Sequence, residues 1–125
     1  MNPEKMITVK ICQADVPNKN NRVYPASVLE TVAQSQKPIL GTVGIPEGWE
    51  IPLDQISHQV TNLRIEDGYL VGNVTILETE AGKAAEALLS SASPDFRMRG
   101  TGLVSKDGVI SDYELISIDL VMNGS

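Results

Sequence analysis

The sequence has little of the chemistry on which metal and disulfide sites depend. Its 125 residues include one cysteine, Cys12, and one histidine, His58. A disulfide needs a second cysteine, and a zinc site of the Cys/His type needs several such ligands. Both are therefore excluded within one chain. The acidic residues around Trp49 lack the regular spacing of a calcium loop, so we expect no bound metal and no cofactor.

Positive charge and long apolar runs are also scarce. Lysine and arginine total 10 against 16 acidic residues, a formal net charge of -6. A duplex-binding surface needs a basic face to neutralise phosphates. No apolar run approaches the roughly 20 residues of a membrane-spanning helix, and the opening MNPEKM lacks the apolar core of a signal peptide. We therefore expect no nucleic-acid partner, no membrane association and a reducing, intracellular location.

The pattern of apolar and turn-forming residues predicts one mainly β domain over residues 1–125. Apolar residues make up 42% of the chain, enough for one modest core. Alternation and turn chemistry predict strands over 6–13 and PILGTVGI, a hairpin over 60–78 turning at Asp67-Gly68, a second hairpin in GLVSKDGVI and a last strand YELISIDLV. Two helices are predicted, from Pro25 to about Gln36 and over 79–91 after a Thr79 cap. The predicted fold class is α+β, a small barrel-like sheet of about six or seven strands with two flanking helices.

Three stretches, in order and spacing, resemble the prohead (procapsid maturation) proteases of tailed bacteriophages. They are NKNNRVYP, ISHQVTNLRIEDGYLVGNVTILETEAGKAAEALL and RGTGLVSKDGVISDYELISIDLV, and the long middle stretch is the most specific. That family is similar in fold to the herpesvirus assembly proteases, and its members cut scaffold and capsid proteins inside the immature head. The resemblance therefore implies capsid or scaffold partners and a location in the host cytoplasm or the phage head. Self-association of the chain stays open.

The sequence departs from this family at both catalytic positions. Family members carry Gly-His-Pro or Asp-His-Pro, whose histidine is the general base, where this chain reads GIP with Ile45. The family's serine nucleophile matches the segment FRMRG, in which Arg97 and Met98 occupy the two candidate positions. An isoleucine side chain has no lone pair to accept a proton. We therefore predict a proteolytically inactive protein that acts by binding in phage head assembly.

The segment SPDFRMRGTG retains parts of the site that the resemblance implies. In the family, the arginine and backbone matching Arg99 and Gly100 help to hold an oxyanion, and without a nucleophile such donors can still bind a carboxylate. We predict that Arg97, Arg99 and Gly100 form a binding surface with Trp49, in a cleft bounded by the Trp49 loop and His58. A large aromatic residue among polar neighbours suits a contact anchor.

The alternative is that the arginines pair internally. Asp119 lies in the apolar run ISIDLV, where a buried acid requires a partner. Arg97 and Arg99 are the natural candidates, and Glu114 is a further acid within reach of the same strand. The sequence leaves both interpretations open.

His58 also has two interpretations. The resemblance matches it to a histidine after Ser57 that serves as a third catalytic member by analogy with the herpesvirus enzymes. An active serine peptidase with displaced residues would use His58 with one of the chain's serines. The other interpretation is a strand-end histidine hydrogen-bonded to backbone. A capsid structural or decoration protein on the same fold is a third hypothesis for function.

Overall fold

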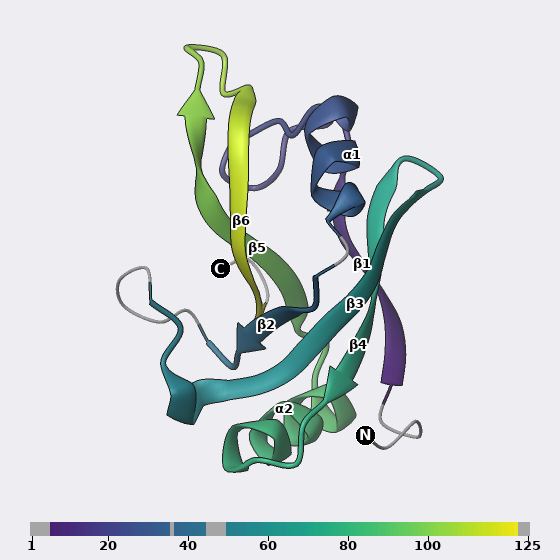
Figure 1. The fold of residues 1–125 in the computed structure, drawn as a ribbon, viewed down its shortest axis with the longest axis vertical. Coiled ribbons are helices and arrows are strands. Elements are labelled where there is room, and N and C mark those ends of the chain that lie inside the picture. The colour runs from purple at the N-terminus through teal and green to yellow at the C-terminus, as the bar shows by residue number, and fades with distance from the viewer. Residues whose placement is uncertain (1–5, 36, 45–49, 123–125) are drawn as a thin grey trace.

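The computed structural model describes residues 6–35, 37–44 and 50–122, which form six strands, two α-helices and a short 3-10 helix (Figure 1). Along the chain the elements are β1 Met6–Gln13, α1 Ala26–Gln34, β2 Ile39–Thr42, η2 Leu53–Gln55, β3 Ile56–Glu66, β4 Tyr69–Ile76, α2 Glu80–Ser91, β5 Asp95–Val104 and β6 Ile110–Val121. The predicted α+β, mainly β class is confirmed.

The strands are divided between two antiparallel sheets. A four-stranded sheet has the order β1-β4-β3-β2, and β5 pairs with β6 in a two-stranded sheet. The sheets meet where β2 ends, because Val43 forms a single parallel bridge with Leu120 and Gly44 N donates to Leu120 O at 2.7 Å. Within the described residues, β1 pairs only with β4 and β5 only with β6. The barrel expected from the sequence is therefore not closed there.

Local turn and cap chemistry explains the best-predicted elements. Asp67 and Gly68 both have positive φ, 51° and 81°, as a tight two-residue hairpin turn between β3 and β4 requires. The Thr79 hydroxyl accepts a hydrogen bond from Gly82 N at 2.9 Å and caps α2 as predicted. The helix expected from Pro25 begins one residue later and ends at Gln34.

The C-terminal strands are longer than the sequence suggested. The predicted short hairpin and separate last strand form one continuous hairpin, in which β6 runs for 12 residues opposite β5. The FRMRG segment lies inside β5. The register shifts between Arg99 and Gly100, and this irregularity hides the alternation by which long strands are recognised.

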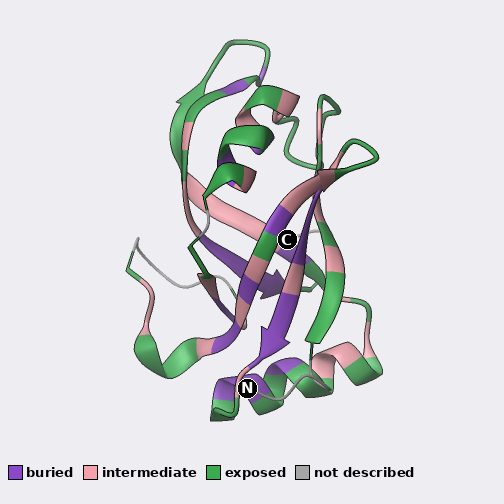
Figure 2. Cartoon of the chain, turned by 45° about the vertical axis from the view of Figure 1, so that its right-hand side comes forward, coloured by how far each residue is buried: buried purple, intermediate pink, exposed green. Residues whose placement is uncertain are grey.

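The core lies between the two sheets and beneath the helices (Figure 2). Its members are buried apolar side chains from α1, β3, β4, α2, β5 and β6: Leu29, Val32, Val60, Leu63, Leu70, Val74, Ile76, Ala85, Phe96, Ile118 and Leu120. α1 packs on β3 and β6, whereas α2 packs on β3 and β4. The last five residues of β6, 117–121, are therefore buried, and they include the polar side chains of Ser117 and Asp119.

Candidate functional site

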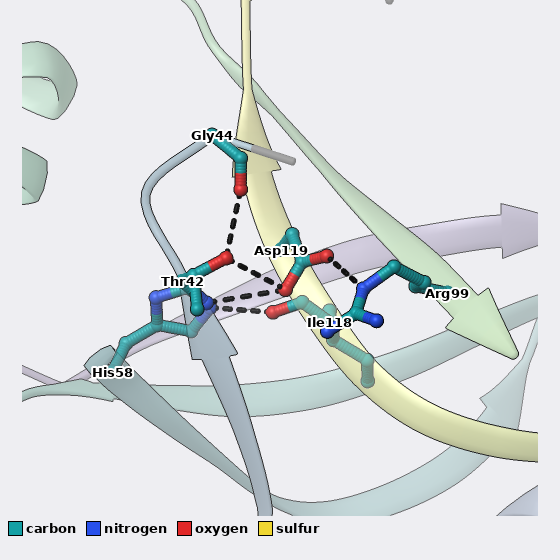
Figure 3. A network of polar contacts seen from close by, with 6 residues as sticks. All are labelled: Thr42, Gly44, His58, Arg99, Ile118 and Asp119. Atoms are coloured by element: carbon teal, nitrogen blue, oxygen red, sulfur yellow. Dashed lines mark hydrogen bonds and ion pairs between the residues drawn. The ribbon is translucent and has the colours of Figure 1, made fainter. Parts of the chain in front are cut away.

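A buried carboxylate, Asp119 on β6, joins the two sheets (Figure 3). Its Oδ1 accepts from Thr42 N at 3.1 Å, and its Oδ2 accepts from Arg99 Nε at 3.0 Å. The Arg99 side chain is 11% exposed and that of Asp119 is 2% exposed. The prediction that a buried Asp119 pairs with one of the two arginines is thus confirmed, and the partner is Arg99.

The hydroxyl of Thr42 closes the network around the end of β2. It lies 2.7 Å from Gly44 O and 3.2 Å from Asp119 Oδ1, and both oxygens can only accept. One hydroxyl proton cannot fully serve two acceptors. The backbone N–H of Thr42 therefore supplies the firm donor to Asp119, and the hydroxyl holds the turn at Gly44.

His58 lies beside the Asp119 network (Figure 3) and is fully buried. Its Nε2 is 2.6 Å from Ile118 O and its Nδ1 is 2.7 Å from Ser57 Oγ. A carbonyl oxygen only accepts, so Nε2 carries the proton and Nδ1 accepts from the Ser57 hydroxyl. The Phe96 ring packs edge-to-face against the imidazole at 5.2 Å. The interpretation of His58 as hydrogen-bonded to backbone is confirmed.

Burial lowers the pKa of His58, although the hydrogen bond to Ile118 and the charge of Asp119 oppose this shift. In an unfolded chain, histidine has a pKa of about 6.5. The unfolded chain therefore binds a proton that the folded chain resists, and stability that is complete above about pH 6.5 is lost as the pH falls through the lower folded pKa.

This linkage gives a testable prediction, because His58 is the only histidine. Urea unfolding between about pH 7.5 and 5 should show stability falling with decreasing pH. In His58→Gln, whose amide can still donate to Ile118 O, most of that slope should vanish. An unchanged slope in the variant would show that other groups cause it.

The other predicted site residues separate in the structure. Arg97 and Met98 are half-buried in β5, where Arg97 is in register with Asp119 and Met98 with Ile118. At Gly100 an added Cβ would collide with Glu114 O and the Tyr113 ring, so close packing explains this glycine. Ile45 and Trp49 lie outside the described residues.

A cavity of about 780 Å³ opens beside the start of β5. It lies between β1, the loop that follows β1, and the start of β5, and is lined by Lys10, Ile11, Cys12, Gln13, Val16, Pro17, Asn18, Lys19, Asn20, Arg22, Tyr24, Asp95, Phe96, Arg97, Met98 and Val121. Neither His58 nor Arg99 lines it. The loop DVPNKNNRVYP, which the sequence marked only as exposed, thus supplies much of its wall.

Two arginines, Arg22 and Arg97, line this cavity together with Tyr24. Burial raises the pKa of the Tyr24 phenol, and the charges of Arg97 and Arg22 oppose that rise. Burial also raises the pKa of Cys12 to about 11, which keeps its thiol protonated and unreactive at neutral pH.

The described residues contain no group of histidine, cysteine or acidic side chains able to hold a metal ion, and no helix among them is long and apolar enough to cross a membrane.

Two sheets joined by the Asp119 network, with helices packed on β3, define a prohead-protease-like fold. This chain is similar in structure to the bacteriophage T4 capsid assembly protease gp21, with a TM-score of 0.80 and 21% sequence identity. The match covers 94% of this chain and 81% of the gp21 chain. No protein-family profile matches the sequence, and no curated protein matches it. At this identity the likeness establishes the fold, and the resemblance found in the sequence is confirmed at that level.

Proposed function

We propose that this protein takes part in phage capsid assembly by binding a capsid or scaffold protein, without hydrolysing it. The protein would act in the host cytoplasm or the procapsid. The similarity in fold to a capsid assembly protease supports a role in capsid assembly. The observation that supports the lack of hydrolysis lies in the first half of β5, where Arg97 and Met98 occupy the positions that the resemblance assigns to the serine. Neither a guanidinium nor a thioether can form the acyl intermediate of a serine protease.

The chemistry of the only histidine supports the same proposal. A general base must reach the proton that it removes from a nucleophile next to substrate. His58 is fully buried, its Nε2 donates to Ile118 O, and burial lowers its pKa. In this arrangement His58 stabilises the fold and is closed to a peptide substrate.

One observation favours a second candidate, a serine peptidase that uses Ser57 and His58. The Ser57 hydroxyl lies 2.7 Å from His58 Nδ1, the contact of a nucleophile with its base. Both residues are fully buried, however, so this activity would require the start of β3 to open. We place this candidate second for that reason.

Incubating the purified protein with the scaffold and major capsid proteins of its own phage tests the proposal. We expect co-sedimentation with one of them, and intact masses for both after prolonged incubation. A Lys83→Gln variant, altered on the exposed face of α2, is the matched control and should behave like the parent. Cleavage of either protein, or a failure to associate with either of them, would contradict the proposal.

A further inference from the structure

The cavity between β1 and β5 concentrates positive charge on an otherwise acidic protein. Among the described residues that line it are four cations, Lys10, Lys19, Arg22 and Arg97, and one acid, Asp95. The whole chain carries a formal net charge of -6. We propose that this cavity binds an acidic peptide segment of the partner protein, with the Arg97 guanidinium holding a carboxylate. This inference rests on the proposed function for the source of the peptide.

Arg97 is available for such a ligand. Its neighbour in register, Asp119, already accepts from Thr42 and Arg99. Within the part of the chain that the structure describes, Arg97 forms no hydrogen bond or ion pair with a protein group. A half-buried guanidinium without an anion is poorly solvated, and a carboxylate can satisfy it with two parallel hydrogen bonds.

The loop after β1 supplies further positive charge at the rim. Asn18 Oδ1 accepts from the backbone N–H groups of Asn20 and Arg22 at 2.9 and 3.0 Å, which holds the loop in a compact turn. Among the described residues, the Arg22 guanidinium donates one hydrogen bond, to the carbonyl of Asn20 at 3.3 Å, and its other N–H groups stay available. Lys19 is exposed on the same loop. A ligand anchored at Arg97 therefore meets two more cations as it leaves the cavity.

Apolar side chains in the cavity favour a peptide over a nucleic acid. Phe96 and Val121 are buried in its wall, and Met98 and Tyr24 are partly buried. Such surfaces accept aliphatic side chains between the acidic ones. A polyanion extending beyond the cavity would meet the negative charge of the rest of the molecule, which raises the cost of binding it.

Fluorescence anisotropy with a defined peptide pair tests this inference. The first probe is a short fluorescein-labelled peptide of glutamate, leucine and alanine, and the second replaces every glutamate with glutamine. At low ionic strength the glutamate peptide should bind about ten-fold more tightly, since a hydrogen-bonded charge pair contributes this much. Added salt should weaken it.

Variants then locate the binding site. Arg97→Gln should remove most of the preference for glutamate, and Lys19→Gln on the exposed loop should weaken binding several-fold. Lys83→Gln makes the same change in net charge away from the cavity and should leave the affinity unaltered. Thermal unfolding of each variant confirms that it is folded, and the Lys19 variant decides the matter if Arg97→Gln is unstable.

The outcomes separate this inference from the proposed function. Equal affinity for the two peptides overturns the carboxylate site even if the protein lacks protease activity. So does an unchanged preference in folded Arg97→Gln, or an unchanged affinity in Lys19→Gln. Displacement of the peptide by equimolar inorganic phosphate or single-stranded oligothymidylate would also overturn it in favour of a phosphate site. Tight, glutamate-dependent binding followed by peptide cleavage would support the cavity and refute the non-hydrolytic function.

Discussion

Replacing Asp119 with asparagine is expected to lower the free energy of unfolding by about 3–5 kcal/mol, the usual cost of removing one partner of a buried ion pair. The change leaves Arg99, whose side chain is 11% exposed, without its carboxylate. It also weakens the acceptor that holds Thr42 N at the junction of β2 and β6. Urea unfolding followed by far-ultraviolet circular dichroism measures the loss.

Two matched variants make this result specific. Asp112→Asn alters an exposed aspartate whose φ of 48° asparagine also tolerates, so stability should change by less than about 0.5 kcal/mol. Arg99→Met combined with Asp119→Leu removes both charges together, and the double variant should be more stable than Asp119→Asn alone. If Asp119→Asn is as stable as Asp112→Asn, the network does not join the sheets as described.

Gly41→Ala should be the second most damaging change, lowering stability by about 3 kcal/mol. Gly41 is buried in β2, and an added Cβ would overlap the carbonyl oxygen of Ile118 and Nε2 of His58. The methyl group would have to displace the hydrogen bond between those two atoms or push β2 away from β6.

Gly102→Ala is the matched control for this close approach. Gly102 is exposed in β5, and the nearest atom to its added Cβ would be Ser111 O at 3.0 Å, a tight contact rather than an overlap. We expect a loss of about 1 kcal/mol or less there. Thermal unfolding of both variants, with the imidazole N–H signal of His58 followed by NMR, shows whether the damage is at the predicted contact. A stable Gly41→Ala variant that retains this signal would refute the close packing.

The elements that could be predicted from the sequence depend on local chemistry. The Asp67-Gly68 turn needs only two residues that accept positive φ, and the Thr79 cap needs only a hydroxyl three residues before Gly82 N. The order of these signals along the chain also carried the resemblance to the prohead proteases, which the fold confirms.

The arrangement of the site depended on contacts between distant segments. The sequence offered Arg97 and Arg99 as equal partners for Asp119. In the fold Arg97 is directly in register with Asp119, but the ion pair forms diagonally with Arg99. Likewise, only the folded chain brings the loop after β1 beside the start of β5 and forms the cavity there. The sequence also could not show that His58 does not border a cleft. Its hydrogen bond to Ile118 O joins residues 60 positions apart, and no local pattern indicates it.

Labelling with a fluorophosphonate probe tests the central claim most directly, because the probe reacts covalently with activated serines. The intact mass of the protein after incubation should be unchanged, as expected if β5 carries no serine and the Ser57–His58 pair stays buried. Stoichiometric addition at one serine, abolished by Ser57→Ala or by mutation of the labelled residue, would show that the protein is an active hydrolase and contradict the account.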